Sequence, residues 1–208
     1  QAIAGDWNHD GRDDFGVYDR STGTFYLDLN SNHVVDCGPD RVCGTGDLGD
    51  EQLAFVKAGF PIGSRAVVGN WDPDGLGAAT ADGDDDIGLF DPASSTWLLD
   101  LDGNHQPNET TFVFGSGAAG DTPVVGDWSN GGRATIGVFN PITGTWRLDD
   151  NGDRLAGEAT FAFNNTGVGV ENPLSAVGNW NGSGGVEVGV FNPRATLGPF
   201  LGNWTIDL

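Results

Sequence analysis

Four copies of a Gly-Asp-Trp or Gly-Asn-Trp triplet divide the chain into repeats, and this repetition constrains the fold more than any other feature. The triplets occupy residues 5–7, 69–71, 126–128 and 178–180, so successive repeats start 64, 57 and 52 residues apart. Each triplet is followed by a polar loop and then by an apolar segment centred on glycine, at residues 15–18, 87–90, 136–139 and 188–191. Such a spacing indicates one supersecondary unit that is copied and that buries its face on its neighbours.

Each repeat predicts four short strands. The first ends at the triplet, as at residues 66–71, and the second is the glycine-centred segment. The third alternates apolar and polar residues, at 24–28, 96–100, 145–149 and 203–207, and a weaker fourth lies at 53–56, 111–114 and 160–163. Clean helical spacing is absent from the sequence, so we predict an all-β protein.

Four antiparallel strands that recur radially are typical of a β-propeller blade. We therefore predict one β-propeller domain over residues 1–208, with four blades at approximately 1–63, 64–121, 122–174 and 175–208. The fourth repeat ends after its third strand, so we expect fifteen strands and a last blade that lacks its outer strand. A fragment of a larger propeller and an open stack of sheets are the alternatives.

The charge of the chain is strongly negative. Its 30 acidic and 9 basic residues give a formal net charge of −21, which argues against nucleic acid and anionic lipid as partners. The acids are 25 Asp and only 5 Glu, and Asp is the carboxylate typical of turns and loops. No run of eighteen apolar residues predicts a membrane span.

The loop between the first two predicted strands of repeat 1 has the composition of a calcium loop. Counted from Asp6, oxygen side chains fall at positions 1, 3, 5 and 9, and Gly11 at position 6 permits a sharp turn. Calcium binds six to eight hard oxygen ligands, and alternate residues of a curled loop face one centre. The predicted ligands are Asp6, Asn8, Asp10, Asp14 and the backbone carbonyl of Arg12 at position 7.

The sequence from Gly5 to Val17 resembles the FG-GAP/VCBS-type repeat of calcium-binding β-propellers, and the resemblance extends over all four repeats. It implies blades stabilised by calcium and an adhesive or interaction role outside the cell. The family motif maps onto Asp6, Asn8, Asp10, the Arg12 carbonyl and Asp14. The better-known propellers of the family have more than four blades.

The corresponding loops of the other repeats depart from this motif. In repeat 2 an insertion leaves the binding register open, and the candidate ligands are Asp72, Asp74, Asp82, Asp84 and Asp86. Repeats 3 and 4 offer one carboxylate each, Asp127 and Glu187. This is too little charge for calcium, so we expect these two loops to hold no metal.

A second series of acidic loops follows the third strand. In repeat 1 the candidate ligands are Asp28, Asn30, Asn32, Asp36 and the Val34 carbonyl, and in repeat 2 they are Asp100, Asp102, Asn104 and Asn108. Repeat 3 offers the weaker set Asp149, Asn151 and Asp153. Position 6 is His33 or His105 in the first two loops, and His tolerates the left-handed conformation less freely than Gly.

The two cysteines, Cys37 and Cys43, flank a Gly-Pro turn, which predicts a local disulfide and hence an oxidising, extracellular compartment. Two reduced thiols in a loop are the alternative.

Together these features predict a secreted calcium-binding β-propeller that serves as a structural or adhesive interaction module and not as an enzyme. Its expected partner is another protein or a second copy, through the open strand edge at residues 203–208. A carbohydrate-binding propeller that stacks an extracellular polysaccharide on exposed Trp97 or Trp146 is the alternative. A polysaccharide-active enzyme with a pair of carboxyl groups about 5–9 Å apart is less favoured.

Overall fold

The computed structural model describes residues 1–34, 52–54, 60–71, 83–101, 103, 109–117, 120–155, 160–162, 173–193 and 203–206. Throughout these residues the regular elements are β-strands, which confirms the all-β prediction. None of the described segments forms a helix long and apolar enough to cross a membrane.

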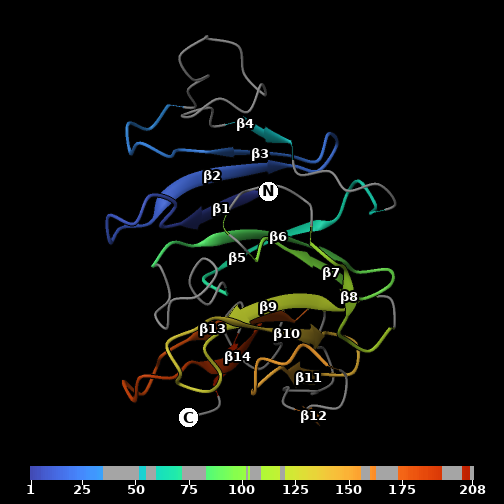
Figure 1. Ribbon diagram of the computed structural model, residues 1–208. Coiled ribbons are helices and arrows are strands. Elements are labelled where there is room, and N and C mark those ends of the chain that lie inside the picture. The colour runs from blue at the N-terminus through green and yellow to red at the C-terminus, as the bar shows by residue number, and fades with distance from the viewer. Residues whose placement is uncertain are drawn as a thin grey trace. The chain divides into compact units, whose positions relative to one another are not determined.

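The strands form four antiparallel sheets, one for each repeat (Figure 1). Repeat 1 contributes β1 (Ala2–Gly5), β2 (Asp14–Asp19), β3 (Thr24–Leu27) and β4 (Gln52–Ala54), and repeat 2 contributes β5 (Arg65–Gly69), β6 (Asp86–Asp91), β7 (Thr96–Leu99) and β8 (Phe112–Val113). Repeat 3 contributes β9 (Thr122–Gly126), β10 (Thr135–Asn140), β11 (Thr145–Leu148) and β12 (Thr160–Ala162). Repeat 4 contributes β13 (Leu174–Gly178), β14 (Glu187–Asn192) and β15 (Asn203–Ile206). In each sheet the strands follow one another in chain order, so each sheet is a meander.

Contacts divide the chain into two compact units, which are described separately. Unit 1 comprises Gln1–Asp91 and Trp97–Phe112, and unit 2 comprises Pro92–Thr96 and Val113–Leu208. Repeats 1 and 2 therefore belong mainly to unit 1, and repeats 3 and 4 belong to unit 2.

The two faces of each sheet differ in their side chains. In repeat 1, Val17 is opposite Tyr26 and Tyr18 is opposite Phe25, and alternate residues of a strand point to opposite faces. We call the face that carries Phe15 and Val17 the aliphatic face, because its equivalents in the other repeats carry aliphatic residues at these two positions. Its equivalents are Ile87 and Leu89 in repeat 2, Ile136 and Val138 in repeat 3, and Val188 and Val190 in repeat 4. The other face, the aromatic face, carries the pairs Tyr18–Phe25, Phe90–Trp97, Phe139–Trp146 and Phe191–Trp204, with ring centroids 4.5–4.8 Å apart.

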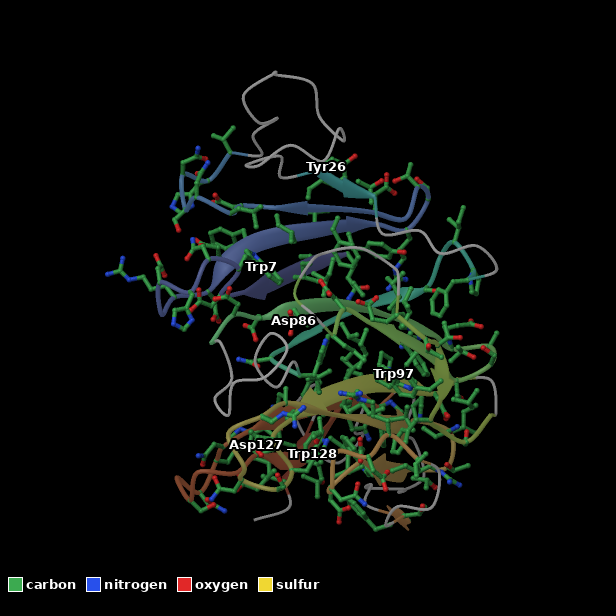
Figure 2. All side chains as sticks on the ribbon, in the orientation of Figure 1. Trp7, Tyr26, Asp86, Trp97, Asp127 and Trp128 are labelled. Carbon is green, nitrogen blue, oxygen red and sulfur yellow. The ribbon has the colours of Figure 1, made fainter. Side chains whose placement is uncertain are left out.

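Within each unit the aromatic face of one repeat packs on the aliphatic face of the next. In unit 1 a single buried cluster joins Trp7, Tyr18 and Phe25 of repeat 1 to Ile87 and Leu89 of repeat 2. In unit 2 the equivalent cluster joins Phe139 and Trp146 of repeat 3 to Val188 and Val190 of repeat 4. In Figure 2, Trp7 lies on the side of the first sheet that faces β5 and β6, as this packing requires.

The first strands of successive repeats also meet inside each unit. β1 contacts β5, and β9 contacts β13. The Gln1 side chain joins the first pair, because its Nε2 donates to the Ala66 carbonyl at 2.9 Å and its Oε1 accepts from the Ala66 amide at 3.1 Å. The two sheets of each unit are thus linked both through their faces and along their first strands.

The glycine at the centre of each second strand lies close to side chains of its own sheet. A Cβ atom on Gly88 would lie 2.7 Å from Leu99 Cδ2 and 3.1 Å from the Leu98 carbonyl oxygen. Gly137 is equally crowded, at 2.7 Å from Leu148 Cδ2. The glycine therefore leaves room for the leucine that ends the third strand.

Candidate functional site

The candidate metal loops fall into two series, and one backbone conformation recurs in both. We call the loop between the first and second strands the AB loop and the loop after the third strand the CD loop, and we number positions from the first Asp or Asn. Position 4 has a positive φ in all six loops whose position 4 is described: His9 (57°), Ser31 (57°), Gly103 (64°), Asn130 (56°), Gly152 (75°) and Gly182 (74°). Position 6 also has a positive φ in the five loops whose position 6 is described: Gly11 (82°), His33 (65°), Gly132 (80°), Arg154 (59°) and Gly184 (102°).

The side chain at position 1 holds the curl in place. In the AB loop of repeat 1, Asp6 Oδ1 accepts from the amide of Asp10 at 3.1 Å, and its Oδ2 accepts from Gly11 at 2.8 Å. Asp127 makes the same two bonds to Gly131 and Gly132, at 2.8 and 2.7 Å. In the CD loop of repeat 1, Asp28 accepts from Asn32 at 3.1 Å and from His33 at 2.7 Å. One carboxylate thus accepts the amides of positions 5 and 6 in both series.

Positions 3 and 5 continue the arrangement. Position 3 accepts from the amide of position 5: Asn8 from Asp10, Asn30 from Asn32, Asn151 from Asp153 and Asn181 from Ser183, at 2.6–3.1 Å. Position 5 accepts from the amide of position 7 in two CD loops, Asn32 from Val34 at 2.7 Å and Asp153 from Leu155 at 2.8 Å. The side-chain oxygens at position 3, and at position 5 of two CD loops, therefore accept amides of their own loop and hold it in a tight curl.

Asp14, at position 9, joins the two loops of repeat 1. Its buried carboxylate Oδ2 accepts from Asn8 Nδ2 at 3.1 Å and from Ser31 Oγ at 2.8 Å. Asn8 Nδ2 also lies 3.1 Å from Ser31 Oγ. The structure therefore brings Asp14 to Asn8 through the Asn8 side-chain nitrogen, and it adds Ser31 of the CD loop as a neighbour that sequence reasoning missed.

The acidic segment of repeat 2 contributes to the AB loop of repeat 1. Asp85 Oδ2 accepts from the Asp6 amide at 3.0 Å, and the Asp85 amide donates to the Asp6 carbonyl at 2.8 Å. Burial raises the pKa of Asp85, and the nearby carboxylates of Asp13 and Asp6 raise it further. Val186 occupies the equivalent position in unit 2, where its amide donates to the Asp127 carbonyl at 3.3 Å.

The neighbours of Asp85 have different surroundings. Asp86, labelled in Figure 2, is buried and pairs with Gly69 as Asp14 pairs with Gly5, so it is position 9 of its loop. Asp84 Oδ1 lies 3.2 Å from Nδ1 of His9. By strand pairing, Asp86 and not Asp84 is the counterpart of Asp14.

The first carboxylates of the CD loops are buried in three repeats. Asp28, Asp100 and Asp149 are 3%, 0% and 1% exposed. Burial raises the pKa of Asp149. The amides of Arg154 and Gly152 donate to its carboxylate and lower the pKa, but the effect of burial is larger. In repeat 1, His33 Nδ1 lies 3.3 Å from Asp28 Oδ2.

The remaining predicted ligands are exposed or lie outside the described residues. The side chain of Asp10 is exposed, and so are Val34 and Arg12, whose backbone carbonyls are predicted ligands. Asp36, Asp72, Asp74, Asp82, Asp102, Asn104 and Asn108 are outside the described residues, as are Cys37 and Cys43. Within the described part of the chain, no three His, Cys, Asp or Glu side chains are gathered closely enough to form a recognisable metal cluster.

The two tryptophans expected as sugar platforms are buried. Trp97 and Trp146 are both 0% exposed, and Trp146 lies in the cluster that joins repeats 3 and 4. The carbohydrate alternative expected both residues to be exposed, and neither offers a stacking surface in this structure.

Comparison with known proteins identified no relative: no protein-family model, curated protein or solved structure matched the chain.

Proposed function

We propose that this chain is a secreted calcium-binding β-propeller that acts as a structural or adhesive module outside the cell. The observation that carries the proposal is the curl shared by the AB and CD loops, in which the side-chain oxygens of positions 1 and 3 accept amides of their own loop. Repeat 1 combines this curl with carboxylates at three of the predicted ligand positions, Asp6, Asp10 and Asp14. Hard oxygen ligands in a tight loop are what calcium prefers.

In the AB loop of repeat 1, calcium would be held by Asp6, Asn8, Asp10, Asp14 and the carbonyl of Arg12. These residues offer the hard oxygens that such an ion prefers; Asp6 anchors the curl, and Asn8 Nδ2 donates to Asp14 Oδ2 at 3.1 Å, which holds the two ends of the loop together. Calcium would neutralise the carboxylates of this loop. The protein's part is to fix the loop and to bury Asp14 and Asp28 behind it.

The CD loop of repeat 1 would use Asp28, Asn30, Asn32 and the Val34 carbonyl, together with Asp36. It shares the Asp14–Ser31 contact with the AB loop, so binding at one loop would order residues of the other. The AB loops of repeats 3 and 4 adopt the same curl with a single carboxylate each, and we propose that they are held by hydrogen bonds alone.

The propeller arrangement is part of the proposal. Meander sheets that pack face to face, with their first strands in contact, are the local features of neighbouring propeller blades. Both units have these features, which supports blades in preference to unrelated sheets.

Calcium titration of matched loop variants tests the binding. Asp10→Ala and Ser183→Ala change position 5 of two AB loops that share one curl, but only the first removes a carboxylate. We expect calorimetry to show the loss of one calcium site in Asp10→Ala and an unchanged titration in Ser183→Ala. A wild-type protein that binds no calcium, or an Asp10→Ala variant that binds as the wild type does, would refute the proposal.

The same ion should stabilise the fold. A site with a Kd of about 10⁻⁴ M adds roughly 1.4 kcal/mol at about 1 mM calcium by mass action. Chelator should therefore lower the melting temperature of the wild type by more than it lowers that of Asp10→Ala.

A further inference from the structure

One residue of repeat 2, Asp85, holds the first residue of the repeat 1 AB loop from outside that loop. The Asp85 carboxylate oxygen Oδ2 accepts from the Asp6 amide at 3.0 Å, and the Asp85 amide donates to the Asp6 carbonyl at 2.8 Å. The two residues are 79 positions apart in the chain, and both belong to unit 1. Asp85 therefore fixes both the amide and the carbonyl group of Asp6.

The same carboxylate reaches the AB loop of repeat 2. Burial raises the pKa of Asp85, and hydrogen bonds from the amides of Asp6 and Asn70 lower it. Asp6 and Asn70 are position 1 of the AB loops in repeats 1 and 2, and they follow the contacting strands β1 and β5. One side chain thus ties together the starts of two successive loops.

Unit 2 has the same contact without the carboxylate. Val186 occupies the position of Asp85, and its amide donates to the Asp127 carbonyl at 3.3 Å. Packing is close at both places, because a Cβ atom on Gly5 would lie 3.0 Å from Asp85 Cβ, and one on Gly126 would lie 2.6 Å from Val186 Cγ2. The carboxylate lies against the loop with three predicted carboxylate ligands, and the valine lies against the loop with one.

We propose that Asp85 is a positioning residue for calcium in the AB loop of repeat 1, so that calcium binding and the packing of repeat 2 on repeat 1 reinforce each other. This inference rests on the proposed function and adds the neighbouring repeat as the regulator of that site. Asp6 starts the curl, because its carboxylate accepts from the amides of Asp10 and Gly11. Asp85 holds the backbone of the same residue and thereby places the first predicted ligand. Coupling between two equilibria is reciprocal, so calcium should in turn hold repeat 2 on repeat 1.

Charge gives this coupling its direction. The carboxylate of Asp85 is repelled by the carboxylates of Asp13 and Asp6. In the empty loop this repulsion opposes the contact between the two repeats, whereas the same negative charge attracts a cation bound there. Asp85 therefore weakens the contact when the loop is empty and strengthens it when calcium is bound. Val186 carries no charge, so the equivalent contact in unit 2 should respond less to calcium.

Amide hydrogen exchange of the wild type, followed by NMR, reads this coupling at single bonds. The amides of Asp6 and Asp85 form the two hydrogen bonds of the contact, and the Val186 amide forms its equivalent in unit 2. We expect saturating calcium to slow the exchange of the first two amides at least about 5-fold more than that of Val186. This measurement needs no substitution, so it decides the matter even if a variant of Asp85 fails to fold.

Variants of Asp85 test its effect on the affinity of the loop. Asp85→Asn removes the charge and keeps a carbonyl oxygen that can accept from the Asp6 amide, and Asp85→Val copies the residue found in unit 2. Calorimetry should show that both raise the Kd of the site that Asp10→Ala removes by about 5-fold or more. A residue that only stabilised the fold would lower the melting temperature and leave this Kd unchanged. Asp19→Asn is the control for net charge, because Asp19 lies at the other end of β2, and it should bind calcium as the wild type does.

The outcomes separate this inference from the proposed function. An unchanged Kd in Asp85→Asn overturns the coupling, and so does exchange at Asp6 and Asp85 that calcium slows no more than at Val186. In either case the proposed function stands if the wild type binds calcium and Asp10→Ala loses one site. A wild type that binds no calcium overturns both.

Discussion

At the scale of single residues, the glycine at the centre of each second strand is fixed by its neighbours. A Cβ atom on Gly88 would lie 2.7 Å from Leu99 Cδ2 and 3.1 Å from the carbonyl oxygen of Leu98, and both leucines are buried. We expect Gly88→Ala to lower the free energy of unfolding by about 1–3 kcal/mol, because overpacking strains a filled core. Gly185→Ala is the control, since its Cβ would meet only atoms at 3.6 Å or more. Urea denaturation that gives equal midpoints for the two variants would contradict this account.

Two carboxyl groups, those of Asp149 and Asp19, should make the stability of the fold depend on pH in opposite directions. Burial raises the pKa of Asp149 above its ordinary value of 3.8, so the folded state binds the proton more tightly than the unfolded state does. Its contribution to stability is present below pH 3.8 and is lost as the pH rises through the folded pKa. The hydrogen bond from Ser21 lowers the pKa of Asp19, so that group contributes above pH 3.8 and its contribution is lost as the pH falls through the folded pKa.

Denaturation in chelator from acid to neutral pH measures both effects. The wild type should lose stability as the pH rises through the folded pKa of Asp149, and this loss should be absent from Asp149→Asn. It should also lose stability as the pH falls through the folded pKa of Asp19, and this loss should be absent from Asp19→Asn. If the difference in free energy of unfolding between wild type and variant changes with pH in the same direction for both variants, the assignment of at least one group is wrong.

At the scale of elements, the loops depend on left-handed backbone at positions 4 and 6. Gly132 has a φ of 80°, and a Cβ atom there would meet no other atom within 4 Å, so space does not explain its identity. We expect Gly132→Ala to cost about 1–2 kcal/mol, because a side chain disfavours this conformation, and Gly132→Asn to cost less, because Asn visits it. Equal urea midpoints for the two variants would show that conformation does not select glycine there. This loop has a single carboxylate, Asp127, and on our proposal that it holds no metal the comparison is independent of calcium.

The sequence predicted the strands better than the loops. The repeat columns located the strands because two-residue alternation and glycine-centred segments leave a direct mark in the sequence. The left-handed position 4 was missed because His9, Ser31 and Asn130 share no residue type with the glycines that occupy it elsewhere. The link from Asp85 to Asp6 was missed because it joins residues 79 apart, which only packing between repeats brings together.

At the scale of the whole molecule, the two contacts between AB loops differ in a way that the repeat pattern does not predict. Asp85 and Val186 occupy the same position, but the Asp85 side chain accepts from the amide of Asp6, and Val186 joins Asp127 through its backbone amide. A repeat pattern predicts the same packing contact for every copy, whereas the residue at that position decides whether the contact carries a charge.

Because the buried clusters join neighbouring repeats, a core mutation should destabilise the two repeats that its cluster joins more than the other two. In repeat arrays each unit is stabilised mainly by its nearest neighbours. Leu89 belongs to the cluster that joins repeats 1 and 2, and Val190 belongs to the cluster that joins repeats 3 and 4. Leu89→Ala removes a buried side chain at a cost of about 2–5 kcal/mol. Amide hydrogen exchange should rise in β1, β2, β5 and β6 of Leu89→Ala, and in β9, β10, β13 and β14 of Val190→Ala. If either variant speeds exchange equally in all four sheets, the two clusters unfold as one cooperative block, and stability is not local to neighbouring repeats.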